Sequence, residues 1–179
     1  TKESGFPDLF LVANISSISI NKDDMLGKGF DALNYQRLGG LKNSVLKRYG
    51  LMGVRFAALY RRFKGLVFHK PPFMYDYRTY YHELISEVDY EENVIQSILP
   101  QWDHTPRSGW NGTFLVNATP EYFALHCQDA FKAIKNKKNK ILFLKSWNEW
   151  GEGNMMEPDM SYGRGFIEAL RDSLDKSDL

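Results

Sequence analysis

Short apolar runs alternate along the chain with longer amphipathic segments, and the two patterns predict strands and helices in turn. Continuous or β-branched apolar runs favour strands over residues 9–20, 30–35, 94–99 and 141–144. The last run, ILFL, contains no polar position, which is typical of the fully buried strands of parallel sheets. Glycines and aspartates in residues 22–29 indicate a turn between the first two strands.

Four segments have the three- and four-residue apolar spacing of helices, over residues 41–49, 76–88, 119–140 and 163–174. Asp76 and Thr119 belong to the residue types that cap helices, and Pro120 suits a first helical position. The lysines within residues 135–140 suit the negative end of a helix, so they favour a solvated cap over a nucleic-acid patch. Residues 54–68 fit either a helix or an extended segment.

This alternation of strands and helices predicts the α/β class with a mainly parallel sheet. A length of 179 residues predicts one domain over residues 1–179, whereas a complete barrel of eight units takes about 250 residues. In such folds the chemistry lies in loops at the carboxyl ends of the strands. The loops that follow residues 94–99 and 141–144 are therefore the candidate sites.

Charge and composition exclude several classes of function. Twenty-three Lys and Arg against 22 Asp and Glu give a net charge of +1, so no global field favours nucleic acid as a partner. No apolar run approaches the roughly 18–20 residues of a membrane span. The single Cys127 and the lack of a signal-peptide pattern at residues 1–5 favour a cytoplasmic location. No zinc-like spacing and no complete phosphate-binding loop is found, so neither metal nor cofactor is expected.

Glu149 and Glu152 follow the strand predicted at residues 141–144 and flank Trp150 and Gly151. Side chains three residues apart lie on one side of a turn, with Cβ atoms about 5–6 Å apart. Retaining glycosidases separate their two carboxyl groups by about 5–5.5 Å and keep one ionised and the other protonated, and two close carboxylates can supply a base and an acid because their pKa values are pushed apart. The pair is therefore a candidate for catalysis, and the alternative is that both glutamates cap the next helix or bind backbone amides.

The four tryptophans gather in or beside the two candidate loops, at positions 102, 110, 147 and 150. The flat indole suits the axial C–H face of a sugar ring. Trp102 and Trp150 are the better candidates for lining a site, while Trp147 is equally compatible with the core.

Asp103, His104 and Arg107 lie together in the first of these loops. A carboxylate and a forked guanidinium can bind vicinal hydroxyls, and an imidazole can donate or accept near neutral pH. The alternative is an aspartate that caps the turn and an arginine that pairs with it. Glu157, next to Pro158 in the second loop, suits the fixing of that loop.

The segment WNEWGEGNMMEPDMSYGRGFIEALR, residues 147–171, resembles the WbsX family of glycosyltransferases from bacterial polysaccharide clusters. Members of that family are similar to glycoside hydrolase family 99. The resemblance continues upstream through LPQWDHTPRSG, the helix after Thr119 and GFDAL at residues 29–33. It implies a (β/α)8 TIM-barrel-like fold, of which this chain covers roughly the last four βα units, and retaining chemistry on α-mannosides.

The resemblance also implies roles for individual residues. Glu149 would draw the proton from the sugar 2-hydroxyl, and Glu152 would protonate the departing oxygen and later activate the acceptor. The implied sugar-binding residues are Trp102, Asp103, His104, Arg107, Trp147, Asn148, Trp150 and Glu157. His104 departs from the family pattern, where Asn is expected.

The expected function is therefore cleavage or transfer of a glycosidic bond in bacterial lipopolysaccharide or capsular polysaccharide biosynthesis. The expected partner is a mannose-like glycan or glycolipid, together with a second copy of the chain or the missing amino-terminal half of a barrel. A non-catalytic glycan-binding module, which keeps aromatic stacking without turnover, remains the alternative.

Overall fold

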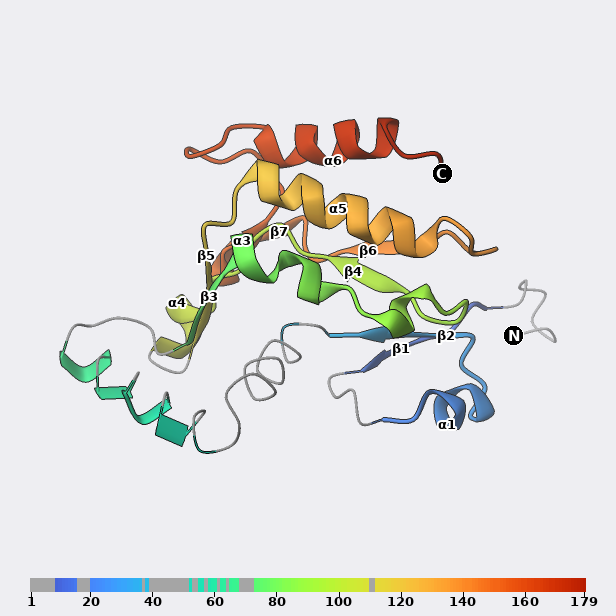
Figure 1. Ribbon diagram of the computed structural model, residues 1–179, viewed down its shortest axis with the longest axis horizontal. Coiled ribbons are helices and arrows are strands. Elements are labelled where there is room, and N and C mark those ends of the chain that lie inside the picture. The colour runs from blue at the N-terminus through green and yellow to red at the C-terminus, as the bar shows by residue number, and fades with distance from the viewer. Residues whose placement is uncertain are drawn as a thin grey trace.

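The computed structural model describes residues 9–15, 20–36, 73–109 and 112–179, and scattered positions between 38 and 67 (Figure 1). Strands and helices are mixed, as the α/β prediction requires. The strands are β1 (Val12–Ile15), β2 (Ala32–Tyr35), β3 (Phe73–Asp76), β4 (Gln96–Ile98), β5 (Thr113–Val116), β6 (Leu142–Leu144), β7 (Asn148–Glu149) and β8 (Asn154–Met155). The helices are α1 (Lys22–Gly27), α3 (Tyr77–Tyr80), α4 (Thr105–Ser108), α5 (Pro120–Ile134) and α6 (Gly165–Asp175), with 3-10 turns η2 (Tyr81–Leu84), η3 (Glu87–Tyr90) and η5 (Trp150–Glu152).

The predicted strands form one parallel array in the order β1, β2, β4 and β6. β1 pairs with β2 and β4 pairs with β6, both in parallel. A parallel bridge between Leu33 and Val94 joins the two pairs, with Leu33 N donating to Asn93 O over 2.8 Å. The prediction of a mainly parallel sheet is thus confirmed, although the strands that the structure describes do not close into a barrel.

A second parallel pair, β3 with β5, was not predicted from the sequence. Both strands are four residues long and lie beside turns that hide their pattern. Phe114 of β5 also bridges Asp103, so β5 is held between β3 and the loop after β4. This pairing of distant segments positions one of the two candidate loops.

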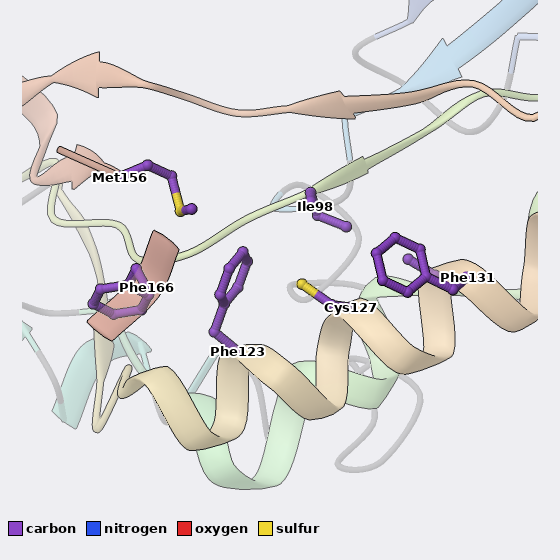
Figure 2. Packing of buried hydrophobic residues seen from close by; sticks show 7 residues of the cluster. Ile98, Phe123, Cys127, Phe131, Met156 and Phe166 are labelled. Atoms are coloured by element: carbon purple, nitrogen blue, oxygen red, sulfur yellow. The ribbon is translucent and has the colours of Figure 1, made fainter. Parts of the chain in front are cut away.

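The main apolar cluster lies between α5, α6 and β4 (Figure 2). Its buried members are Ile98, Phe123, Cys127, Ala130, Phe131, Met156 and Phe166. Thr119 stands at the N-cap of α5 in extended conformation and Pro120 follows it, as the sequence predicted. Met156 enters the cluster from the segment after β8, and it anchors the second candidate loop to the core (Figure 2).

A second apolar cluster lies beneath the first candidate loop. Its buried residues are Tyr75, Tyr77, Leu84, Leu99 and Leu115, and Trp102 packs against them. The Tyr77 hydroxyl donates to Leu99 O over 2.6 Å, which satisfies its polar atom inside the cluster. Burial raises the pKa of Tyr77 well above its ordinary value.

Two local predictions are wrong in detail. Residues 22–29 contain the helix α1 and not only a turn, because the Asn21 side chain accepts from Asp23 N and caps the first turn. The helix predicted over residues 76–88 begins at Asp76, which accepts from Arg78 N as predicted, but α3 ends at Tyr80 and two 3-10 turns follow. A reciprocal capping box between Ser86 and Asp89 starts the second of these turns afresh.

Two predictions of burial are wrong in part. Of the lysines predicted to form a solvated cap, Lys135, Lys138 and Lys140 are exposed, but Lys137 is only 5% exposed. Its Nζ donates to Val94 O over 2.5 Å, and burial lowers the pKa of Lys137. Phe143 of β6 is 38% exposed, so the face of β6 that carries this side chain is not fully covered by the described residues.

The remaining predictions concern residues 36–72. The helix predicted at 41–49 lies outside the described residues. For the ambiguous segment 54–68, every position that the structure describes is helical. Across the described part of the chain, no helix combines the length and the apolar character needed to traverse a bilayer.

Candidate active site

The chain that leaves β6 folds into a small hairpin in which β7 and β8 flank η5. Asn148 pairs with Met155 and Glu149 pairs with Asn154. Gly153 closes the hairpin with φ +51°, and its N–H donates to Trp150 O over 3.1 Å. A Cβ on Gly153 would stand 2.9 Å from the Cβ of Asp103. Only glycine therefore fits this turn while the two candidate loops stay in contact.

A clamp between Ser146 and Asn154 fixes the backbone of Glu149. Ser146 N donates to Asn154 Oδ1 over 3.0 Å, and the Ser146 hydroxyl donates to Asn154 O over 2.6 Å. The same hydroxyl accepts from Glu149 N over 3.2 Å. Asn154 is 1% exposed. Sequence reasoning missed both residues, although a serine two positions after a strand and an asparagine directly after a glycine turn are a usable signal.

The first candidate loop is tied to the second through Asp103. Its N–H donates to Glu152 O over 2.8 Å, and its Oδ1 accepts from Thr105 N over 2.9 Å and from the Thr105 hydroxyl over 2.6 Å. His104 N donates to Thr113 O over 2.9 Å, which adds β5 to the same unit. Asp103 thus caps the turn that leads into α4, the alternative role that the sequence left open.

Arg107, on α4, reaches both glutamates. Its Nη1 lies 2.6 Å from Glu152 Oε1, and its Nη2 lies 3.7 Å from Glu149 Oε1. The two carboxylates therefore approach one guanidinium and lie on the same side of the hairpin. Gly151 leaves room for this arrangement, because a Cβ there would stand 3.2 Å from Glu149 Oε1 and 3.9 Å from Arg107 Nη2. Arg107 therefore pairs with the two glutamates. The alternative from the sequence, in which Arg107 pairs with Asp103, is wrong.

The two glutamates differ in their surroundings. The Glu152 side chain is 14% exposed, and its Oε1 also lies 3.4 Å from His104 Nε2. The Glu149 side chain is 43% exposed and Arg107 is its charged neighbour within ion-pair range in the described part of the chain. Glu152 thus lies in a closer-packed environment of donors, while Glu149 faces solvent.

The Trp102 ring is partly covered by its neighbours. It packs against the cluster of Tyr75 and Tyr77, and the His104 ring lies 6.0 Å away at 31°. Lys145 Nζ stands 5.2 Å from the ring centroid, in cation–π range. Trp102 therefore acts in part as a support for the loop and holds His104 beside Glu152.

The tryptophans of the hairpin are accessible. Trp147 and Trp150 are each 50% exposed. Asn148, which lies between Trp147 and Glu149 in the chain, is exposed as well. Trp150 Nε1 donates to Glu157 Oε2 over 2.6 Å. Glu157 therefore fixes the orientation of the Trp150 ring. Trp110 lies outside the described residues.

The assembled groups suit acid–base chemistry. Two carboxylates, one guanidinium and one imidazole meet where two loops follow the parallel strands β4 and β6. Within the described ranges, no three His, Cys, Asp or Glu side chains are grouped as a metal site requires.

Comparison with known proteins gives one extensive match. The family model described as Glycosyltransferase WbsX matches residues 1–170. Two relatives, each described as "Uncharacterized protein WxcX", come from Xanthomonas campestris pv. campestris. One, from strain B100, is 25% identical over 58% of this chain and 15% of its own length. The other, from strain ATCC 33913, is 30% identical over 44% of this chain and 12% of its own length.

The chain thus spans a small part of the length of these relatives. A solved structure described as "Glycoside hydrolase-like protein" covers 80% of this chain and 37% of its own, with a TM-score of 0.43 and 15% identity.

Proposed function

Because the chain belongs to the WbsX glycosyltransferase family, we propose that Glu149 and Glu152 are the acid–base pair of a carbohydrate-active enzyme. The enzyme cleaves or transfers a glycosidic bond with retention of configuration. The observation that supports this proposal best is Arg107, whose single guanidinium lies within ion-pair range of both carboxylates. Two carboxyl groups that face one shared position are what a two-carboxylate mechanism needs.

In the first step Glu149 accepts the proton of the sugar 2-hydroxyl. The oxygen of that hydroxyl forms a bond to the anomeric carbon. The bond from that carbon to the leaving oxygen breaks, and Glu152 donates a proton to this oxygen. In the second step Glu152 takes a proton from the acceptor, whose oxygen attacks the anomeric carbon. The bond from that carbon to the sugar 2-oxygen breaks, and Glu149 returns its proton to this oxygen. Water as acceptor gives hydrolysis, and a sugar hydroxyl gives transfer.

Arg107 Nη1 donates a hydrogen bond to Glu152 Oε1 over 2.6 Å. A carboxyl oxygen cannot both accept from a guanidinium and hand a proton to a leaving oxygen at the same position. Since the Arg107 side chain is 59% exposed, it can turn toward solvent or toward the sugar hydroxyls when the glycan enters. His104, 3.4 Å from the same oxygen, stays beside Glu152 as a positioning group.

The substrate that fits this proposal is a mannose-like glycan or glycolipid of bacterial lipopolysaccharide or capsular polysaccharide biosynthesis, made in the cytoplasm. The half-exposed rings of Trp147 and Trp150 offer faces for the sugar, with Asn148 and Asp103 nearby in the two loops. Residues 1–179 then form part of one domain, and β1, β2, β4 and β6 correspond to four βα units of a (β/α)8 barrel. A second copy or an amino-terminal half completes the wall of the site.

The test compares Glu149→Gln and Glu152→Gln on two α-mannosides, one with an activated aryl leaving group and one with a sugar leaving group. Loss of a general acid matters most when the leaving oxygen needs a proton. Glu152→Gln is expected to lose about 10²–10⁴-fold in turnover of the sugar-linked substrate and much less with the activated one. Glu149→Gln is expected to lose turnover of both.

Glu168→Gln on α6, away from both loops, is the matched control and is expected to keep full turnover. Equal losses on both substrates for Glu152→Gln would mean that Glu152 is not the acid. A wild-type chain that binds mannosides, measured by calorimetry, without turning over either substrate would identify a glycan-binding module instead.

A further inference from the structure

Lys145 lies at the edge of the candidate site, although sequence reasoning did not single it out. It follows β6 directly, and its N–H donates to Ile98 O over 3.0 Å, so the pairing of β6 with β4 extends to its backbone. Leu142 and Leu144 pack against the main apolar cluster, and side chains alternate between the two faces of a strand. Phe143 and Lys145 therefore lie on the face of β6 that points away from α5.

The Lys145 side chain reaches the first candidate loop. Its Nζ lies 5.2 Å from the centroid of the Trp102 ring, and that ring lies 6.0 Å from the ring of His104. His104 Nε2 in turn lies 3.4 Å from Glu152 Oε1. The ammonium group thus belongs to the same connected set of side chains as the acid proposed above.

Within the part of the chain that the structure describes, no carboxylate lies in ion-pair range of the Lys145 ammonium group. The acidic side chains of the two loops bind other groups. Both glutamates lie near Arg107, Asp103 accepts within its own turn, and Glu157 accepts from Trp150. Lys145 is half-buried, so its charge has lost part of its hydration and would be stabilised by an anion that enters the site.

We propose that Lys145 binds an anionic group of the glycan, a phosphate or a carboxylate, and so selects acidic sugars for the site. The inference rests on the proposed function, because it names the substrate class of that same site. Lysine presents three donors around one compact charge and binds phosphate in this way. In a partly desolvated site such charge-assisted hydrogen bonds contribute more than an ion pair on the open surface.

The other role open to Lys145 is to hold the Trp102 ring by cation–π attraction. The two roles predict different losses of affinity. A support for Trp102 serves every ligand alike, so its removal weakens neutral and anionic sugars equally. An anion-binding residue affects the anionic sugars alone.

The experiment measures, by calorimetry, the binding of four ligands to the full chain. They are methyl α-mannoside, which is neutral, and the anionic mannose 1-phosphate, mannose 6-phosphate and methyl α-mannosiduronate. The wild-type chain is expected to bind at least one anionic ligand about 10- to 100-fold more tightly than the neutral one, and this preference should fall as salt is raised. The phosphates and the uronate distinguish the two sources of the charge.

Lys145→Gln is expected to lose the preference and to keep the affinity for methyl α-mannoside, whereas Lys145→Arg is expected to retain the preference. The matched control is Lys140→Gln, the same change of charge at an exposed lysine before β6, which should bind all four ligands as the wild type does. Circular dichroism of every variant checks that the fold is kept.

The proposal is overturned if the wild-type chain prefers none of the anionic ligands, or if Lys145→Gln weakens all four ligands equally. Neither outcome affects the turnover test of Glu149 and Glu152, because that test uses α-mannosides without an anionic group. A preference that depends on Lys145, without turnover of any mannoside, would support the anion site and contradict the proposed enzyme.

Discussion

The cluster beneath α5 and the hairpin after β6 are neighbours in the chain but are held together by different forces. Phe123, Phe166 and Met156 are at most 2% exposed and pack by apolar contact. The hairpin keeps Glu149 and Glu152 in place by single hydrogen bonds and ion pairs, with half-exposed tryptophans around them. The segment 154–156 belongs to both regions. Within about ten residues, one motif thus contains both a buried side chain that anchors the hairpin to the core and the solvent-accessible residues of the candidate site.

The largest effect on stability is expected in the cluster. Phe123→Ala removes a fully buried ring from the contact with Phe166, whose centroid lies 5.6 Å away. Loss of a buried phenylalanine costs about 3–5 kcal/mol of unfolding free energy, measured by urea denaturation. Leu125→Ala on the same helix is the matched control, because Leu125 is 38% exposed and should cost far less. A similar loss in both variants would contradict the comparison.

The next largest effect is the titration of His126, a buried residue of α5. Burial lowers the pKa of His126 to about 4, against a smaller opposing contribution from the Tyr81 backbone. Between pH 6.5 and 4 the unfolded chain takes up a proton that the folded chain does not, so stability falls as pH falls and is constant from this group below 4. The expected loss is about 3 kcal/mol. Urea denaturation across this range should show the slope, and His126→Gln should lack it.

Gly153→Ala tests the junction between the hairpin and the first loop. The φ of +51° and the 2.9 Å approach to Asp103 Cβ predict strain of about 1–3 kcal/mol and a loss of turnover, because the two loops would separate. Gly27→Ala in α1 is the control, since a Cβ there meets nothing within 4 Å. A Gly153 variant as stable and as active as the Gly27 variant would show that the contact is dispensable.

The smallest effect on stability is expected at Arg107. Arg107→Gln breaks exposed ion pairs, which contribute about 0–1 kcal/mol, yet turnover should fall roughly 10- to 100-fold, because Glu152 loses a hydrogen bond to a charged group and Glu149 loses its charged neighbour. Arg171→Gln, which breaks the exposed ion pair with Asp172, should leave turnover unchanged. Thermal melts and steady-state kinetics on both variants separate the two quantities. Equal turnover in the two variants would place Arg107 outside the site.

The sequence predicted those elements whose pattern is local. The apolar runs at β2, β4 and β6 and the Thr119–Pro120 start of α5 appear as expected. The short strands β3 and β5 were missed, because each gains its strand character from its partner across the molecule. Phe143 was wrongly expected to be buried, since burial depends on what packs against that face of the sheet and not on the run itself.

The sequence alone identified the two glutamates three residues apart and the tryptophans around them as candidate site residues, and it predicted the parallel α/β class. Spacing and periodicity are properties of neighbouring residues, so these features can be read without a structure. Tertiary structure alone decided that Arg107 meets both glutamates, that Asp103 caps its own turn, and that Ser146 and Asn154 hold the backbone of Glu149. These contacts join residues up to 45 positions apart. Such partners are chosen by chain packing in space, which no local pattern encodes.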